Sequence, residues 1–302
     1  MKLNFNGLIA AGFSPFKVDG TPDLDKIPPL VDKLIKEGIN GFYLMGSTGE
    51  GVSVKLEQRL AITEAYFKAV NKRVPIIVNV THSSYGASAD LSRHAVQMGA
   101  DALSATAPSY YGISGIDQLI YAVEKITDCQ DQIPFIYYHI PGKTGLNFKM
   151  HTFLEQLDKR IPQLGGIKYT ASSMDDFMLC KENYGDRYKM FFGVDELFLP
   201  ALAMEADTFI GSTYNFMLPY YKNILKYYGT DNHKVALENY RNVVEIINAF
   251  LRYDGLASQK AILKMNGFDF GQPISPILPL TDNEYNYLKQ NLESLHYFDH
   301  VK

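Results

Sequence analysis

The sequence predicts an α/β protein, a (β/α)8 TIM barrel with a C-terminal helical extension. Short apolar runs alternate with segments of helical spacing. They form about eight units of roughly 25 to 30 residues, the length that a βαβ crossover requires. The runs are apolar at consecutive positions, which is typical of parallel strands covered by helices on both faces. Eight units favour closure into a barrel. An open doubly wound sheet is the alternative, but no GxGxxG follows the first run and no Walker sequence is present.

The predicted strands are short runs bounded by glycine, proline or polar residues. In chain order they cover residues 8–13, 41–45, 74–80, 102–105, 133–138, a run that ends at Lys168, 190–193 and 208–211. The helices predicted between them cover residues 21–38, 56–67, 87–98, 116–126, 149–158, 174–183 and 196–205. The first of these helices is expected to open at Thr21-Pro22-Asp23 and to end at Gly38.

A weak internal repeat supports the count of units. Residues 36–42, 97–103 and 203–209 each run from a helix end through a small residue and Asn or Asp into an apolar strand. A structural αβ unit that is repeated along the chain is expected to produce such recurring helix–strand junctions.

Beyond about residue 215 the strand pattern stops. Helical patterns follow at 220–228, 235–253, 258–265 and 282–295, interrupted by Gly255, by the stretch 267–271 and by three prolines between 273 and 279. We therefore expect a barrel over residues 1–229 that carries the active site, and a C-terminal helical region over 230–302.

Composition excludes several classes of partner. The 302-residue chain has a net charge of -4 and no basic run, so neither nucleic acid nor an anionic membrane is an expected partner. No segment reaches the ~18 apolar residues of a membrane span, and a cytoplasmic location is expected. Apolar residues make up 46% of the chain, as in ordinary globular proteins with a large core.

Cysteine and histidine show no metal-binding pattern. Cys129 and Cys180 lie far apart without CxxC or Cys/His spacing, so neither a disulfide framework nor a zinc site is predicted. Structural roles are expected for four histidines without ligand spacing, His82, His94, His139 and His151.

Lys168 is the residue whose surroundings most clearly indicate a catalytic role. It follows the apolar and glycine-rich run 164–167 and precedes Tyr169, whereas a surface lysine usually has polar neighbours. An amine in apolar surroundings loses hydration, so its neutral form is favoured and it can form a Schiff base with a ketone. The alternative is a lysine whose amine reaches solvent at the strand end.

The active sites of such barrels lie at the C-terminal ends of the strands, and this rule selects further residues. Gly46–Glu50 follows the second strand, where two hydroxyls and adjacent backbone N–H groups could cradle a carboxylate. Tyr138 ends the fifth strand, Gly193–Glu196 follows the seventh and Gly211–Thr213 the eighth. Together with Lys168, one rim would hold an amine, a phenol and an anion cradle, a set suited to Schiff-base chemistry on a keto acid.

Each of these pieces also has a structural explanation. Gly-Ser-Thr-Gly is an ordinary turn sequence. Tyr138 could belong to the core, and Asp195-Glu196 could cap the helix that follows.

Five motifs carry a resemblance to a known family. They are Gly-Ser-Thr-Gly-Glu at 46–50, Tyr-His-Ile-Pro at 138–141 with Thr144-Gly145, Gly-Ile-Lys-Tyr-Thr at 166–170, Phe-Gly-Val-Asp-Glu at 192–196 and Gly-Ser-Thr-Tyr-Asn at 211–215. With them the chain resembles the N-acetylneuraminate lyase and dihydrodipicolinate synthase family of pyruvate-dependent class I aldolases, over nearly its whole length. The motifs at 192–196 and 211–215 look like the lyase branch.

The resemblance implies a reversible aldol cleavage of N-acetylneuraminate to pyruvate and N-acetylmannosamine. It implies that Lys168 forms the Schiff base and that Tyr138, aided by Ser47 and Tyr110, exchanges a proton with the sugar hydroxyl next to the breaking bond. The other implied substrate-binding residues are Thr48 and Gly49 for the carboxylate, with Ser47, and Thr170, Gly193, Asp195, Glu196 and Ser212 for the polyol.

The resemblance also implies the cofactor requirement and the oligomeric state of the protein. No metal or organic cofactor is expected, because the substrate itself is bound covalently to Lys168. Members of the family are commonly tetramers, so a homotetramer is expected, with Tyr110 and Tyr111 at a subunit contact.

Lys143 departs from the lyase pattern. The synthase branch carries an arginine in this loop for a second carboxylate, whereas lyases usually carry an apolar residue. A cation at 143 keeps open a second reading, another pyruvate-dependent aldolase or synthase of the same family. A catalytically silent barrel that senses a keto acid is the alternative from another class.

Overall fold

The computed structural model describes residues 3–108, 110–128, 132–157 and 160–301. Its eight strands form one closed barrel in the order β1 to β8, with parallel neighbours, which confirms the predicted fold class. The strands are β1 (Gly7–Ala11), β2 (Gly41–Leu44), β3 (Ile76–Asn79), β4 (Ala102–Ala105), β5 (Phe135–His139), β6 (Leu164–Tyr169), β7 (Lys189–Phe192) and β8 (Thr208–Gly211).

The first and last strands meet near the N-terminus. The Gly7 N–H donates to the Asp207 carbonyl at 2.8 Å, and the Leu8 N–H donates to the Asn40 side chain at 2.9 Å. Gly7 has φ 79°, and a Cβ there would lie 2.2 Å from Asn40 Oδ1. Glycine is therefore required where β1 begins.

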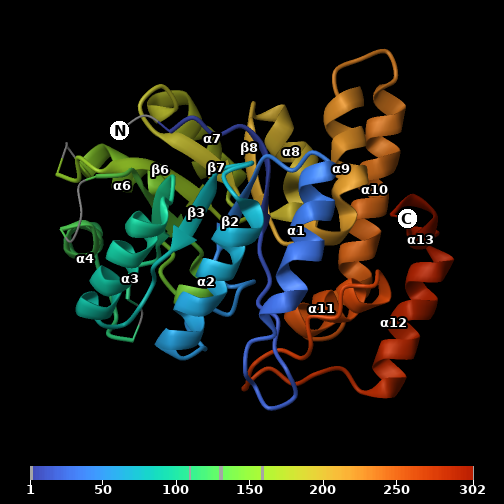
Figure 1. Cartoon of the computed structure of the whole chain (residues 1–302). Helices are drawn as coiled ribbons and strands as arrows, with labels where there is room; N and C mark the ends of the chain where they lie inside the picture. Colours follow the sequence, from blue (N-terminus) through green and yellow to red (C-terminus); the bar gives the residue numbers. More distant parts are fainter. Residues whose placement is uncertain (1–2, 109, 129–131, 158–159, 302) are drawn as a thin grey trace. The chain divides into compact units, whose positions relative to one another are not determined.

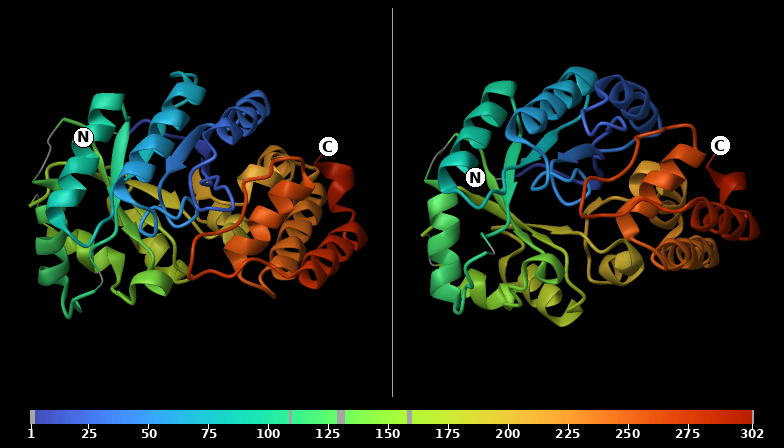
Figure 2. Two further views of the ribbon diagram at one scale, coloured as in Figure 1. Left: turned by 60° about the horizontal axis from the view of Figure 1, so that its bottom comes forward. Right: turned by 90° about the horizontal axis from the view of Figure 1, so that it is seen from below.

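The chain divides into two compact units, Met1–Ile9 with Asn40–Gly46 and Pro75–Gly211, and Ala10–Ile39 with Ser47–Val74 and Ser212–Lys302. The first unit holds the beginning of β1 and all of β2 to β8. Its helices lie outside these strands (Figure 2). They are α3 (Tyr85–Met98), α4 (Ile116–Thr127), α5 (Pro141–Thr144), α6 (Met150–Leu157), α7 (Met174–Tyr184), the 3-10 helix η2 (Asp195–Leu197) and α8 (Phe198–Ala203).

The second unit contains the predicted C-terminal helices, and α9 and α10 lie side by side in it (Figure 1). Its helices are η1 (Leu24–Lys26), α1 (Ile27–Lys36), α2 (Leu56–Val70), α9 (Tyr214–Tyr227), α10 (His233–Phe250), α11 (Gly255–Met265), α12 (Asp282–Ser294) and α13 (Tyr297–His300). Thr281 and Glu284 form a capping box that fixes the start of α12.

The predicted start of the first helix is confirmed: Asp23 is the N-cap of η1, which starts at Leu24 and continues into α1 at Ile27. One predicted helix start is wrong. The helix predicted from 220 begins at Tyr214 instead. It accommodates Pro219 because Met217 leaves helical geometry, with φ -129° and ψ 17°.

Two predictions concern residues at the edge of the described chain. The helix predicted at 149–158 is present as α6, and residue 158 lies outside the described residues. Cys180 is buried in α7, and burial raises the pKa of its thiol, whereas Cys129 lies outside the described residues. No helix in the described part of the chain is both long enough and apolar enough to cross a membrane.

Candidate active site

Lys168 is buried near the end of β6, where only 5% of its surface is exposed. Its Nζ lies 3.8 Å from the ring centroid of Tyr138 and 4.5 Å from that of Tyr43. The amine therefore does not reach bulk solvent at the strand end. It lies against the faces of two aromatic rings, which can hold a cation such as a protonated iminium.

The register of the sheet explains why the amine and the phenol meet. Tyr138 and Lys168 are paired positions of the parallel strands β5 and β6, so their side chains leave the sheet in the same direction. Gly166 allows β6 to approach β7, since a Cβ there would lie 2.2 Å from the Lys189 carbonyl oxygen. The glycines before Lys168 are thus a packing requirement of the strand that carries it.

Tyr43, on β2, lies beside Lys168 and Tyr138 and is not among the residues predicted from the sequence. Its hydroxyl donates to Ser104 Oγ at 3.1 Å and accepts from Asn79 Nδ2 at 2.9 Å. Its ring stands edge-on to Tyr138, with 5.8 Å between centroids and 79° between planes. Side chains of β3 and β4 therefore hold the ring that contacts the Lys168 amine.

Thr170 and Gly193 lie beside Lys168. The Thr170 hydroxyl is buried and has no hydrogen-bond partner within the described chain. A Cβ at Gly193 would lie 2.3 Å from that oxygen and 3.4 Å from Lys168 Cε. Gly193 therefore leaves open the space in front of the lysine, and Thr170 supplies a hydroxyl there for a polar ligand.

Asp195 and Glu196 differ in their surroundings. Asp195 is 7% exposed and lies so close to the β8 terminus that a Cβ at Gly211 would be 2.0 Å from its Oδ1. Glu196 is exposed. Both belong to η2, whose N-cap position is Val194, so neither carboxylate occupies the capping position.

Lys143, Tyr110 and Tyr111 are exposed residues of this unit. Lys143 lies in the short helix α5. Tyr110 and Tyr111 are each 84% exposed after β4, and their rings pack edge-on with 5.2 Å between centroids. Large aromatic side chains left this exposed are typical of a surface that another molecule covers.

The buried His139, next to Tyr138, has a structural environment. Its ring lies 5.2 Å from that of Tyr169, and burial lowers its pKa to about 4, against the opposing effect of Asp176. Asp176 accepts hydrogen bonds from the Tyr169 hydroxyl at 2.9 Å and from His151 Nδ1 at 2.7 Å. Burial acts to raise the Asp176 pKa, but the hydrogen bonds from the Met150 N–H, from His151 and from Tyr169 together hold it below its usual value. The network anchors the chain directly after Lys168.

The predicted carboxylate-binding residues belong to the second unit. Ser47 is exposed, Thr48 half-buried and Gly49 buried. Ser14 Oγ donates to the Gly49 carbonyl at 2.6 Å, which fixes this short loop. Ser212 is half-buried, and its carbonyl accepts a hydrogen bond from the Asn215 side chain at 2.8 Å.

Residues 4–295 match the Dihydrodipicolinate synthetase family. The chain belongs to this family. It is therefore a lyase of the class I aldolase type, whose family chemistry uses pyruvate and a Schiff base without a metal cofactor. Within the described residues, no group of three or more His, Cys, Asp or Glu side chains is arranged to hold a metal ion.

Similar members of the dihydrodipicolinate synthetase family are named N-acetylneuraminate lyase. N-acetylneuraminate lyase A of Xenopus laevis is 37% identical over 213 residues, 70% of each chain. N-acetylneuraminate lyase of Rattus norvegicus is 29% identical over 98% of this chain and 94% of its own length. The structure of the Aliivibrio salmonicida N-acetylneuraminate lyase superposes with a TM-score of 0.94 at 30% identity, over 99% of this chain and 100% of that chain.

Four of the site residues predicted from the sequence lie close together within the first unit of this family member. Lys168 contacts Tyr138, and Gly193 lies next to both Lys168 and Thr170; the structure adds Tyr43, which also contacts Lys168. Tyr43 lies in an apolar run whose pattern marks only a buried strand. The signal that could have found it is its place near the C-terminal end of β2, three positions before Gly46.

Proposed function

We propose that the protein is an N-acetylneuraminate lyase that cleaves N-acetylneuraminate reversibly into pyruvate and N-acetylmannosamine. The observation that carries the proposal is the buried Lys168 amine against Tyr138 and Tyr43. Beside it lies the Thr170 hydroxyl, for which the described residues provide no hydrogen-bond partner. Substrate binding can replace the water that such a hydroxyl would otherwise need. The lyase names of relatives that align along most of the chain agree with this choice of substrate.

Lys168 starts the reaction as a nucleophile. Its neutral amine attacks the ketone of the open-chain sugar acid, and loss of water gives an iminium. The iminium withdraws electrons from the neighbouring carbon–carbon bond. When that bond breaks, its electron pair becomes the enamine, so no unstabilised carbanion forms.

Tyr138 manages the proton of the same step. The hydroxyl next to the breaking bond becomes the aldehyde of N-acetylmannosamine, and Tyr138 relays its proton: the phenol oxygen accepts this proton while the phenol's own proton passes to a water molecule. A proton from this water then converts the enamine to the iminium of pyruvate, and a second water hydrolyses the iminium to release pyruvate and restore Lys168. Ser47 and Tyr110 are proposed to assist the proton exchange.

The remaining polar groups would select the substrate. Ser47, Thr48 and Gly49 are proposed to bind the carboxylate through hydroxyls and backbone N–H groups. The polyol would meet Thr170, Gly193, Asp195, Glu196 and Ser212. Carboxylate oxygens accept hydrogen bonds only, so Asp195 and Glu196 are suited to sugar hydroxyls, which donate them.

A coupled assay of pyruvate release from N-acetylneuraminate tests the proposal. Wild type should release pyruvate, Lys168→Ala should not, and borohydride added with pyruvate should modify wild type at Lys168 only. Lys149→Ala is the matched control, because Lys149 is an exposed lysine paired with Asp175 at 2.9 Å. Stabilisation by sialic acid without turnover, unchanged in Lys168→Ala, would instead identify a keto-acid sensor.

Lys143 favours a second candidate, a pyruvate-dependent aldolase or synthase whose other substrate carries an acid group. Its exposed ammonium on α5 could pair with a second carboxylate. Pyruvate consumption with a panel of aldehydes, with and without a carboxylate, separates the two candidates. Preference for the acidic aldehydes that Lys143→Leu abolishes would favour the synthase-like reaction.

We also propose that the enzyme is cytoplasmic and forms a homotetramer, with the exposed pair Tyr110 and Tyr111 at a contact between copies. Sedimentation analysis of wild type and of Tyr110→Ser/Tyr111→Ser tests the oligomeric state. A monomeric wild type would refute the proposed tetramer.

A further inference from the structure

A buried ion pair ties the loop that follows β2 to helix α11, inside the second unit. Lys260 Nζ lies 2.7 Å from Glu50 Oε1, and the two side chains are 1% and 3% exposed. Glu50 is the last residue of Gly-Ser-Thr-Gly-Glu, directly after Gly49. The proposed catalytic steps use neither charge.

Both charges are supported by additional contacts. Lys260 donates to the Gln272 carbonyl at 3.0 Å and lies over the Phe16 ring, 4.7 Å from its centroid. Glu50 Oε2 accepts the Ile274 N–H at 2.5 Å. A buried pair is tolerated only when its remaining hydrogen-bonding capacity is used in this way. The pair therefore also fixes the segment 272–274 against the loop.

The backbone of the loop needs such support. Glu50 has φ 55°, in the left-handed region that non-glycine residues seldom adopt. Residues in this region persist where the surroundings over-determine them, and they cluster at ligand sites. Here Ser14 Oγ holds the Gly49 carbonyl at 2.6 Å and Arg59 holds the Gly51 carbonyl at 3.1 Å, so Glu50 is fixed on both sides.

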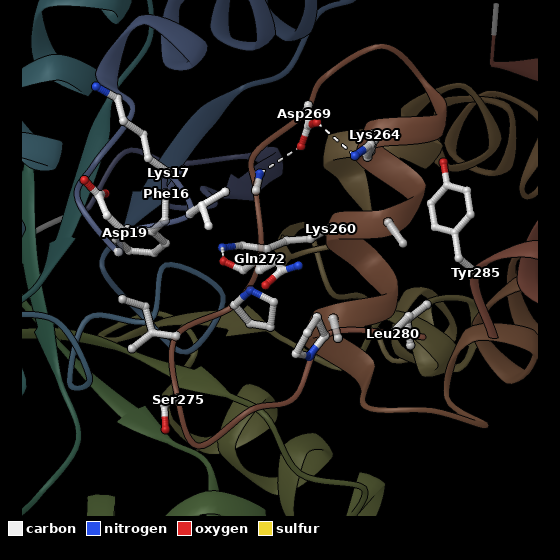
Figure 3. Close-up of a pocket in the computed structure, with 18 of the residues that line it drawn as sticks. Phe16, Lys17, Asp19, Lys260, Lys264, Asp269, Gln272, Ser275, Leu280 and Tyr285 are labelled. Atoms are coloured by element: carbon white, nitrogen blue, oxygen red, sulfur yellow. Dashed lines mark hydrogen bonds and ion pairs between the residues drawn. The ribbon is translucent and has the colours of Figure 1, made fainter. Parts of the chain in front are cut away.

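Lys260 also lines an open pocket of about 690 Å³ (Figure 3). One turn further along α11, Lys264 pairs with Asp269 at 3.1 Å at the same pocket, and its side chain is 57% exposed. The pocket mixes Lys17, Lys260 and Lys264 with Asp19, Asp269 and Asp282, so its charges do not select an anion or a cation. Lys264 thus provides a control lysine on the same helix that does not contact the loop.

We propose that the Lys260–Glu50 pair is a positioning device that holds Ser47, Thr48 and Gly49 in the conformation that binds the substrate carboxylate. It rests on the proposed function, since it assigns the origin of carboxylate affinity in that same site. A pre-ordered loop does not lose conformational freedom when ligand binds, so affinity for the carboxylate is higher. Two residues more than 200 positions apart would then control one binding step.

Trapping of ketones on Lys168 by borohydride tests the inference. Pyruvate has the carboxylate, whereas acetone forms the same kind of iminium without one. In Lys260→Met and in Glu50→Leu/Lys260→Met, the half-saturating pyruvate concentration should rise about tenfold or more, with acetone trapping unchanged within about twofold. Lys264→Met should match wild type for both ketones.

The double variant separates positioning from stability. Removing one partner leaves a buried unpaired charge, but replacing both by apolar side chains leaves none, and such replacements are often neutral for folding. Wild-type pyruvate affinity in the double variant would overturn the inference, as would equal loss for pyruvate and acetone. If wild type itself traps no pyruvate on Lys168, the proposed function falls and the inference with it. Wild-type trapping with unaffected variants overturns the inference alone.

Discussion

Acidification should destabilise this protein through His139 in particular. His139 is 2% exposed, and burial lowers its pKa from 6.5 to about 4. The folded state therefore binds fewer protons than the unfolded state between pH 6.5 and 4. The contribution of His139 to stability is therefore fully present above the unfolded-state pKa of 6.5, and it is lost as the pH falls toward the folded-state pKa of about 4.

The magnitude follows from the shift. A difference of about 2.5 units at 1.36 kcal/mol per unit gives about 3 kcal/mol of unfolding free energy lost by pH 4. His139→Phe keeps a ring beside Tyr169 and lacks this titration. His139 Nδ1 has no hydrogen-bond partner among the described residues, so no bond at that nitrogen is lost by the substitution.

The assay is urea unfolding at pH 7, 5.5 and 4, followed by circular dichroism. Between pH 7 and 4, wild type should lose about 3 kcal/mol more than His139→Phe. Other titrating groups, including Asp176, are common to both proteins and cancel in the comparison. If the two stabilities fall in parallel, His139 is not held neutral by burial and the reasoning is refuted.

Three further predictions concern the site around Lys168. Tyr138→Phe should retain borohydride trapping of pyruvate but lose about 10²- to 10⁴-fold in kcat for cleavage, and equal loss of both would contradict the proton-transfer role. Gly193→Ala should lower activity and destabilise the folded state by about 1 to 3 kcal/mol, because the added Cβ would lie 2.3 Å from Thr170 Oγ1. Thermal melting and the pyruvate assay measure the two effects. A variant with wild-type stability and activity would show that the space at Gly193 is not needed. Tyr43→Phe removes the hydrogen bonds with Ser104 and Asn79 and should lower the free energy of unfolding, measured in urea, by about 1 to 3 kcal/mol. A change near zero would mean that these hydrogen bonds do not hold the ring.

The strands and their order were predictable because their information is local. A parallel strand covered on both faces is a continuous apolar run, and a βαβ crossover has a minimum length, so alternation and count together indicate a barrel. Helix starts were less predictable. Pro219 favours a helix boundary, but a local distortion at Met217 lets the helix begin at Tyr214, so the start predicted from 220 is wrong.

The site divides in the same way. Lys168 and Tyr138 were found from sequence because each ends a strand, and the barrel rule brings strand ends together without knowledge of contacts. The sequence alone therefore determined the fold class and the family resemblance, and it singled out Lys168 as the candidate nucleophile.

Tertiary structure decided what surrounds these residues. Tyr43 and the Lys260–Glu50 pair have no local signature: one is an aromatic residue in an apolar strand, and the others are charges 210 positions apart that meet at 2.7 Å. Periodicity reports which residues are buried, but it does not report which buried residues touch. Contacts between distant segments depend on the packed fold, and only there do burial and distance give a side chain its role.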